Sequence, residues 1–183
     1  MKKLLFVVLL VSTLQLYSQE ETGKFDFRFG IGVAFLGSGD MKTVTFENEL
    51  NYKLSNYFAA SLSVDYGKSF SGIYESASYL QGNLNLFISP FRNNRKNDFR
   101  VGAGFSLMNV SETYGQAEYC GVGLPPNYTE PLFDNRDSFG YNIIIEDVYN
   151  ISKRFLIGLK LFTQPYTNED INSGVLVKAG FLF

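Results

Sequence analysis

Histidine and tryptophan are absent from this sequence of 183 residues, and cysteine occurs once, as Cys120. Without imidazole, no side chain has an unperturbed pKa near neutrality, so Ser/His and Asp/His catalysis are excluded. Metal sites built on histidine or cysteine are excluded as well. A single cysteine cannot form an intrachain disulfide, and no histidine is present to activate the Cys120 thiol. We therefore expect no catalytic residue, no metal and no cofactor.

Carboxylates are the remaining candidates for acid–base chemistry, because Glu47 and Glu49 would share one face of an extended segment. Two glutamates placed in this way are more often salt-bridge partners than a general acid and base. The glycine-containing stretches at 30–32 and 121–123 open no helix, so no phosphate cradle is indicated. These observations favour a non-enzymatic protein.

Long apolar runs are also scarce, and the one at Leu4–Val11 is too short to cross a bilayer as a helix, which needs ~20 residues. It follows two lysines and leads to small and polar residues that end at Ser18, a pattern typical of a secretory signal peptide. We predict a signal peptide over 1–18 and one mature domain over 19–183. Loss of the two lysines leaves 14 basic against 18 acidic residues, a net charge of −4, which argues against nucleic-acid binding.

What the chain does contain is a repeated alternation of large apolar residues with polar or small ones. In 25–35, every second residue is Phe, Ile or Val, and Asp26, Arg28 and Gly30 stand between them. A β-strand sends successive side chains to opposite faces, so one face of each such run is apolar. The pattern predicts eight strands, at 25–35, 44–54, 58–66, 80–88, 99–107, 139–145, 155–161 and 175–183.

The connections between these runs differ in length. Three are short, at 55–57, 92–98 and 150–153, and four are mostly longer, at 37–41, 68–79, 112–138 and 165–173. Eight consecutive strands without a helix predict an all-β, antiparallel up-and-down barrel. Several runs reach the ~9–11 residues that a tilted strand needs to cross a membrane. Short turns at one rim and longer loops at the other are typical of outer-membrane barrels and predict that both termini are periplasmic.

Alternation alone does not tell whether the apolar face meets lipid or a core, so a soluble lipocalin-like barrel remains an alternative. Two observations favour a transmembrane barrel. The opposite face is rich in Gly, Ala and Ser, which suit a narrow lumen better than a solvent-exposed surface. The chain has no tryptophan and therefore lacks the Gly-x-Trp signature of lipocalins.

The last six residues, from Lys178 to Phe183, resemble the C-terminal signal of bacterial outer-membrane barrels, in which a terminal aromatic residue is recognised by the barrel assembly machinery. Together with the signal peptide and the eight runs, this ending makes the mature chain resemble the OmpA/OmpX-type small-barrel superfamily. The resemblance implies a monomer in the outer membrane of a Gram-negative bacterium. It also implies Phe181 and Phe183 as the assembly signal, with outer-membrane lipids and the assembly machinery as partners.

The lumen of an eight-stranded barrel is just wide enough for its own side chains to fill it. Because an unpaired buried charge costs several kcal/mol, we expect a network of ion pairs there, with a proton or ion path as the rival interpretation. Asn48 falls on the lipid side, for which a β-bulge is the available explanation. The predicted lumen charges are five acids and five bases: Asp26, Arg28, Glu47, Glu49, Lys53, Asp65, Arg100, Glu146, Lys160 and Lys178.

Aromatic residues recur at the ends of the runs and predict girdles at the two lipid–water interfaces. The candidates at the short-turn rim are Tyr52, Phe58, Phe91, Phe99, Tyr149 and Phe155. The candidates at the other rim are Tyr66, Phe139, Tyr141 and Phe162.

The longest connection, 112–138, is the place with most room for recognition of an extracellular ligand, since loops on a rigid scaffold commonly carry function. A solvated loop that merely folds over the barrel mouth is equally compatible with it. We predict a structural or surface-interaction role; the alternatives are a narrow porin-like channel and an accessory barrel of secretion or envelope biogenesis. The candidate recognition residues are Tyr114, Tyr119, Tyr128, Phe133 and Arg136.

Overall fold

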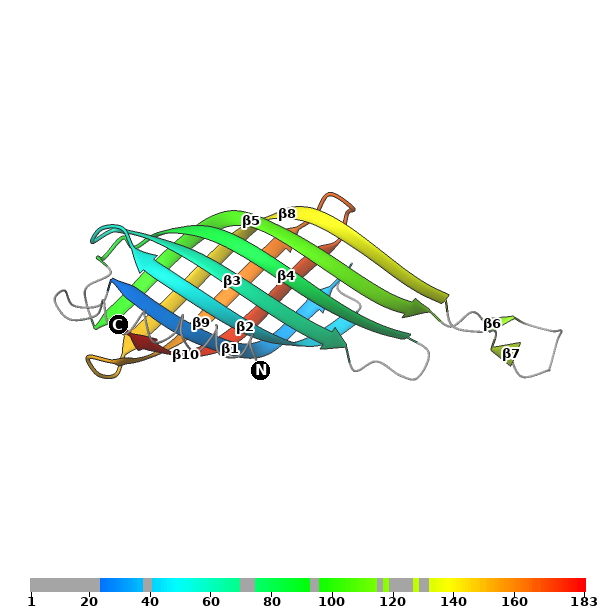
Figure 1. Cartoon of the computed structure of the whole chain (residues 1–183), viewed down its shortest axis with the longest axis horizontal. Coiled ribbons are helices and arrows are strands. Elements are labelled where there is room, and N and C mark those ends of the chain that lie inside the picture. Colours follow the sequence, from blue (N-terminus) through cyan, green and yellow to red (C-terminus); the bar gives the residue numbers. More distant parts are fainter. Residues whose placement is uncertain are drawn as a thin grey trace, which may run out of the picture.

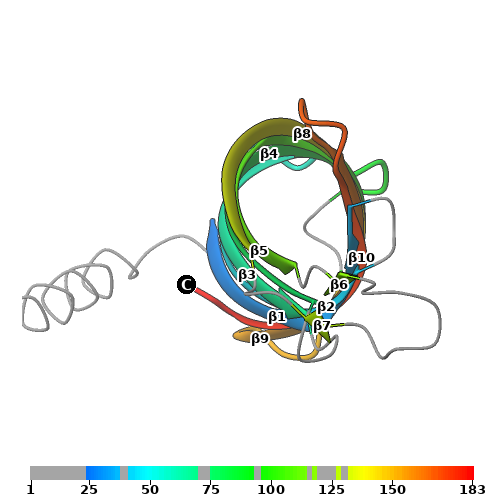
Figure 2. The same cartoon turned by 90° about the vertical axis from the view of Figure 1, so that its right-hand side faces the viewer.

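Eight long strands close into a single antiparallel barrel in the computed structural model, and Figure 1 and Figure 2 show the ring from the side and end-on. Each strand pairs with its neighbours along the barrel sequence, and β1 pairs with β10, so the predicted up-and-down barrel is confirmed. The structure describes residues 24–37, 41–69, 75–92, 96–114, 117–118, 127–128 and 132–183, so the expected signal peptide lies outside it. The strands are β1 (Phe25–Leu36), β2 (Met41–Lys53), β3 (Phe58–Ser69), β4 (Glu75–Ile88), β5 (Asn97–Tyr114), β8 (Leu132–Asn150), β9 (Phe155–Pro165) and β10 (Ile171–Leu182).

The barrel has two different ends. We call the turn end the one with the short links 54–57, 89–96 and 151–154, where Phe183 also lies. At the ribbon end, on the right of Figure 1, β5 and β8 run beyond the other strands as a two-stranded ribbon. Two further short strands, β6 (Ala117–Glu118) and β7 (Asn127–Tyr128), pair with each other between β5 and β8. No helix among the described residues is both long and apolar enough to span a membrane.

The ribbon corrects the expected loop at 112–138. Pairing of β5 with β8 continues without interruption to Thr113–Phe133 and Tyr114–Leu132, so only 115–131 separate the two strands. The expected loop at 68–79 is shorter for the same reason, since β3 runs to Ser69 and β4 begins at Glu75. Apolar–polar alternation fades in these extensions because outward residues such as Asn109 and Asp137 are polar there, so the period-2 signal disappears.

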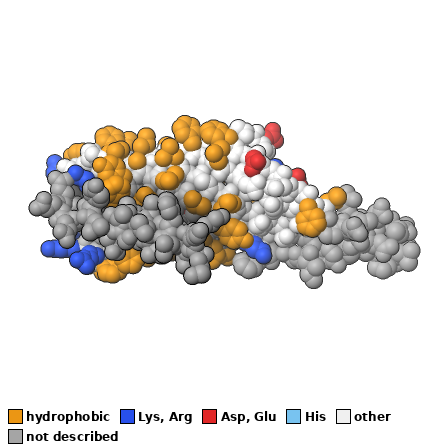
Figure 3. Space-filling model, viewed as in Figure 1, with side chains coloured by type: hydrophobic (Ala, Val, Ile, Leu, Met, Phe, Trp, Pro, Cys, Tyr) orange, Lys and Arg blue, Asp and Glu red, His pale blue; other side chains and the backbone are white. Residues whose placement is uncertain are grey.

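Outward side chains form an apolar belt round the barrel, which Figure 3 shows as orange atoms. The belt ends abruptly on β5 and β8. Leu107 and Phe139 are outward-facing register partners within it, whereas the next outward pair along each strand is Asn109 and Asp137. Asn109 Nδ2 donates to Asp137 Oδ1 at 2.8 Å. The edge of the apolar belt therefore lies between these two pairs, and the ribbon projects beyond it.

Asn48 does lie on the outer, apolar face as predicted, but the explanation by a β-bulge is wrong. Its register partners are Phe29 on β1 and Val64 on β3, and both ladders continue evenly on either side of it. Asn48 is therefore a polar residue among apolar neighbours in a regular strand.

Inward-facing glycines make room for aromatic rings in the lumen. At four positions a glycine lies directly opposite an aromatic residue on the neighbouring segment, and an added Cβ atom would fall 2.1–2.8 Å from the ring. This arrangement, in which a ring covers a cross-strand glycine, explains why small residues alternate with the apolar belt. The pairs are Gly67 with Tyr79, Gly102 with Phe87, Gly140 with Tyr166, and Gly174 with Phe162.

The Phe162 ring is therefore not part of a lipid-facing girdle, and that prediction is wrong. The side chain is buried and belongs to an apolar cluster inside the barrel with Phe87, Ile144 and Leu176. A second cluster, which includes Tyr79 and Tyr166, lies towards the ribbon end, where β1 ends and β4 begins. Both clusters contact polar side chains of the lumen: Phe87 contacts Arg100, and Tyr166 contacts Gln81.

Candidate functional site: the lumen network and the two rims

Eight buried charges fill the half of the lumen nearest the turn end, and each is no more than 1% exposed. Four are acids and four are bases, so their formal charges cancel. We call them the lumen ion network. Its members are Asp26, Glu47, Glu49, Glu146, Arg28, Arg100, Lys160 and Lys178.

Arg100 has the most extensive contacts in the lumen ion network. Its Nε and Nη2 donate to Glu146 Oε2 at 3.1 and 2.7 Å, and Nη2 also donates to Glu49 Oε1 at 3.1 Å. Nη1 donates to Asn51 Oδ1 at 2.8 Å. The guanidinium carbon lies 3.9 Å from the centroid of the Phe87 ring. Arg100 thus joins β2, β4, β5 and β8 across the lumen.

Arg28 neutralises the other side of Glu146. Its Nη1 donates to Glu146 Oε1 at 2.8 Å, and its Nη2 donates to Asp26 Oδ2 at 3.0 Å. Asp26 is two residues earlier on the same strand and therefore faces the same side of it. Glu146 consequently lies between two guanidinium groups, an arrangement that offsets much of the cost of burying its charge.

The two lysines reach the glutamates of β2 from β9 and β10. Lys178 Nζ lies 2.6 Å from Glu47 Oε1 and also donates to Glu49, while Lys160 Nζ donates to Glu47. Gly30 lies between Lys178 and Glu47 in the register, and an added Cβ there would be 3.2 Å from Glu47 Cβ. The absence of a side chain at Gly30 lets the lysine and the glutamate meet across it.

Two of the predicted lumen charges form no ion pair within the described part of the chain. Lys53 is only half-buried, because it is the last residue of β2 at the turn end. Asp65 is 2% exposed, but its Oδ2 accepts hydrogen bonds from Gln81 Nε2 at 2.9 Å and Asn83 Nδ2 at 2.8 Å instead of from a cation. Its register partner on β2 is Glu47, whose carboxylate the lysines of the network already bind.

Amide and hydroxyl groups occupy the lumen between Asp65 and the ribbon end. Gln81 Oε1 accepts from Tyr166 OH at 2.8 Å and from Asn172 Nδ2 at 3.2 Å. Tyr166 OH also lies 2.7 Å from Ser106 Oγ. The alternation already places several of these residues inside, but uncharged amides carry no sequence signal that tells which of them are bonded to each other. The interior is therefore ionic at one end and amide-rich at the other.

Arg136 holds the base of the ribbon together at the opposite end. Its Nη1 and Nη2 donate to the two oxygens of Glu112 at 2.9 and 2.8 Å, and Nη2 also donates to Asp170 Oδ2 at 2.9 Å. A further contact joins Nη1 to Asp134 Oδ2 at 3.1 Å. Partial burial lowers the pKa of Arg136, but the hydrogen bonds to Glu112 and Asp170 outweigh this effect, so the pKa is raised. Arg136 thus fastens β8 to β5 and to the β9–β10 turn.

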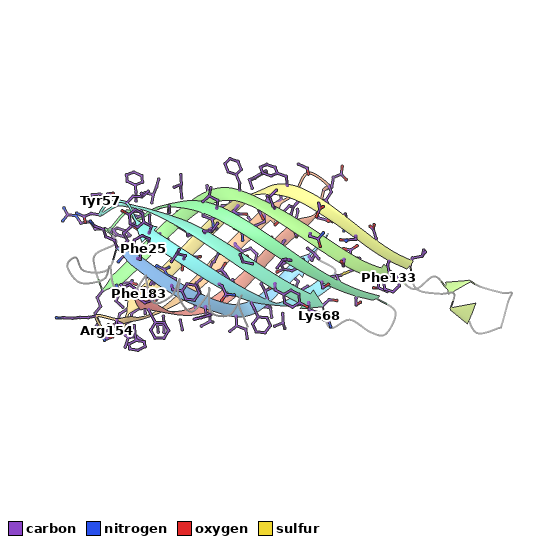
Figure 4. The ribbon with its side chains drawn as sticks, in the orientation of Figure 1. Phe25, Tyr57, Lys68, Phe133, Arg154 and Phe183 are labelled. Atoms are coloured by element: carbon purple, nitrogen blue, oxygen red, sulfur yellow. The ribbon has the colours of Figure 1, made fainter. Side chains whose placement is uncertain are left out.

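The predicted recognition residues do not share a loop. Phe133 and Arg136 are strand residues of β8, and Phe133, labelled at the ribbon end in Figure 4, is 82% exposed. Tyr114 ends β5 and Tyr128 is in β7. Tyr119 lies outside the described residues.

The turn end carries exposed aromatic rings. The rings of Phe25 and Tyr52 are 4.6 Å apart between centroids, and those of Phe155 and Phe181 are 4.9 Å apart. Phe183, the last residue, donates its backbone N–H to Phe25 O at 2.9 Å, which continues the β1–β10 ladder. Of the predicted girdle, Phe99 is half-buried, and the exposed members are Tyr52, Phe58, Phe91, Tyr149 and Phe155.

These features define a class: a closed antiparallel barrel with an apolar exterior, aromatic residues at its rim and a polar, filled lumen has the fold of a small bacterial outer-membrane β-barrel. Several solved structures share it. Neisserial surface protein A (NspA) superposes with a TM-score of 0.64 at 12% identity, covering 90% of this chain and 100% of that one. The attachment invasion locus protein Ail of Yersinia pestis has a TM-score of 0.61 at 10% identity, covering 89% and 100%.

Outer membrane protein OprG from Pseudomonas aeruginosa has a TM-score of 0.59 at 10% identity and covers 90% of this chain and 98% of that one. No protein-family model and no curated protein sequence matches the chain. At 10–12% identity these likenesses establish the fold alone.

Proposed function

We propose that this chain is a non-enzymatic integral protein of the outer membrane that acts at the cell surface. The β5–β8 ribbon would face outwards, and both termini would lie in the periplasm. The observation that carries the proposal is the filled lumen: the lumen ion network and the amides beyond it occupy the barrel interior. The exposed polar ribbon is then the part left for contact with a partner.

The lumen contacts favour this role over that of a narrow porin-like channel. A channel needs a continuous wet path, whereas Arg100, Glu49 and Glu146 contact each other directly in the turn-end half. Opening such a path would break buried ion pairs, at about 3–5 kcal/mol for each partner left uncompensated. We therefore expect the protein to leave planar bilayers at background conductance. Defined single-channel steps from the purified wild type would overturn the proposal.

The exposed ribbon supports a surface-interaction role. Its outward face beyond the apolar belt is a ladder of polar side chains, in which Asn109 and Ser111 donate to Asn135 at 3.1 and 3.4 Å. Phe133 is highly exposed among them. An exposed aromatic residue surrounded by hydrogen-bonding groups is common at binding surfaces.

The charge of the ribbon end bears on the kind of partner. One of the solved structures shows Ail with the heparin analogue sucrose octasulfate, a polyanion. In this chain the described ribbon end carries five acids, against the bases Arg136, Lys42 and Lys68, so acids predominate. The acids are Glu112, Asp134, Asp137, Glu169 and Asp170. We therefore propose a neutral or basic partner rather than a sulfated sugar.

Location and orientation can be tested with one pair of cysteine variants in a Cys120→Ser background. Phe133→Cys probes the ribbon end, and Arg154→Cys probes the turn end; both residues are exposed, and Figure 4 labels them at opposite ends. A membrane-impermeant maleimide should label Phe133→Cys on intact cells, and Arg154→Cys only after the outer membrane is opened. The reverse pattern would refute the orientation, and recovery as a freely soluble protein would refute the membrane location.

Assembly is the last part of the proposal. We propose that Phe181 and Phe183 form the signal recognised by the barrel assembly machinery and that the protein functions as a monomer. Both rings are exposed on or next to the last strand, where a recognition factor can reach them before the barrel closes. Replacing Phe183 with alanine should lower the amount of protein in the outer membrane.

A further inference from the structure

The turn end carries a group of exposed basic side chains that neither the lumen nor the ribbon uses. Figure 3 shows Lys and Arg side chains gathered there, and Arg154 points away from the barrel in Figure 4. Asp147 carries the only exposed acidic side chain that the structure describes at this end. We call this group the basic rim; its members are Lys24, Arg92, Lys96, Lys153 and Arg154.

The basic rim is fixed to the barrel by its backbone. The carbonyl oxygens of Lys24, Lys96 and Arg154 each accept a hydrogen bond from an amide of a neighbouring strand, at 2.8, 2.8 and 2.9 Å. Arg92 has a φ of 72°, which is unfavourable for a residue with a Cβ atom, and its Nε donates to Tyr57 OH at 3.0 Å. The rim therefore presents its charges from defined positions.

The basic rim lies at the level of the exposed aromatic residues. The guanidinium carbon of Arg92 is 5.8 Å from the centroid of the Tyr57 ring, and Lys96 Nζ is 5.1 Å from that of Tyr149. Rings of this kind lie at the depth of lipid headgroups in membrane proteins. The basic groups should therefore meet the headgroup phosphates directly.

Four of the five charges are also available to an external anion. Arg92, Lys96, Lys153 and Arg154 form no salt bridge with any residue that the structure describes. The opposite end differs, since the exposed acids Asp134, Asp137 and Glu169 lie there and Arg136 is bound by carboxylates. The surface charge of the barrel is thus basic beside one edge of the membrane and mainly acidic beyond the other.

We propose that the basic rim binds anionic phospholipids, through the phosphodiester of headgroups such as phosphatidylglycerol in the leaflet next to the turn end. Basic residues close to a membrane surface favour anionic over neutral lipids by roughly fivefold for each residue engaged. This inference rests on the proposed membrane insertion, and the leaflet follows from the proposed orientation.

Native mass spectrometry of the full protein, released from a neutral detergent, tests the inference. Phosphatidylglycerol and phosphatidylcholine with identical acyl chains are added at equal concentration. The rim variant replaces Arg92, Lys96, Lys153 and Arg154 with glutamine. The matched control replaces Lys42 and Lys68, two exposed lysines at the ribbon end, with glutamine. Heat-dependent mobility on a gel establishes that each variant has folded.

We expect the wild type and the control to retain phosphatidylglycerol at least fivefold over phosphatidylcholine, and the rim variant, which keeps only Lys24 of the basic rim, to lose most of this preference. Equal retention by the wild type overturns the inference, as does an unchanged preference in the rim variant. Binding of the wild type to isolated peptidoglycan without any lipid preference would assign the rim to a different partner and also overturn it. The lipid-retention experiment is made in detergent and the maleimide-labelling test on cells. A negative lipid result would therefore not contradict the proposed location and orientation.

Discussion

Replacing Arg100 with methionine should destabilise the barrel strongly, because it removes the guanidinium that joins two buried glutamates. The change deletes four hydrogen bonds, to Glu146, Glu49 and Asn51, and the stacking contact with Phe87. Four acids of the lumen ion network would then face three bases. Removing one partner of a buried ion pair costs about 3–5 kcal/mol. Since Arg28 and Lys178 remain near the glutamates, we expect a loss of about 3 kcal/mol in the free energy of unfolding.

Arg136→Met is the matched control, since Arg136, like Arg100, contacts several carboxylates: three, at distances of 2.8 to 3.1 Å, against two for Arg100. Its side chain is 28% exposed, against 1% for Arg100. Ion pairs open to water contribute about 0.2–1 kcal/mol. The two variants therefore lose similar contacts, and the expected difference between them measures the effect of burial.

The measurement is equilibrium unfolding by urea in lipid bilayers. It is followed by far-ultraviolet circular dichroism, because the chain has no tryptophan to report by fluorescence. We expect the denaturation midpoint of Arg100→Met to fall well below that of Arg136→Met. Equal losses in the two variants, or a loss below about 1 kcal/mol for Arg100→Met, would refute the reasoning from buried ion pairs.

The same unfolding assay tests two further changes, and cell fractionation a third. Asp65→Asn should leave the free energy of unfolding unchanged or raise it by about 1 kcal/mol. It removes a buried charge that forms no ion pair with the residues the structure describes, and it keeps an acceptor for Gln81 or Asn83. A clear loss would show that the carboxylate is paired. Gly102→Ala should cost about 1–3 kcal/mol, since the added Cβ would lie 2.6 Å from the Phe87 ring. Gly82→Ala is its control, because a Cβ atom added at Gly82 would meet no neighbouring atom within 4 Å. Equal losses in the two variants would contradict the packing argument. Phe183→Ala should lower the yield in the outer-membrane fraction by a larger fraction than it lowers the free energy of unfolding of the refolded protein. An unchanged yield would argue against the assembly signal.

The eight strands and the two faces of each were predictable from the sequence. Lipid and lumen impose opposite requirements on successive residues, so runs such as 25–35 record the period of a strand and its sidedness. The predicted interior positions of Arg28, Arg100 and Glu146 follow from the same alternation. The ribbon extensions of β5 and β8 lack this alternation, so the sequence predicted a loop where the structure has paired strands.

Tertiary structure alone decided which charges meet. Even spacing places Lys53 and Asp65 on the same inner face as Glu49, yet the structure leaves both without an ion pair among the described residues. A pairing depends on register between strands and on the depth of each residue in the barrel, and neither is encoded in one strand. The sequence by itself therefore determined a barrel with a charged interior. Closure of β1 onto β10 brought the lysines of β9 and β10 within reach of the glutamates on β2, because it joins segments more than 100 residues apart.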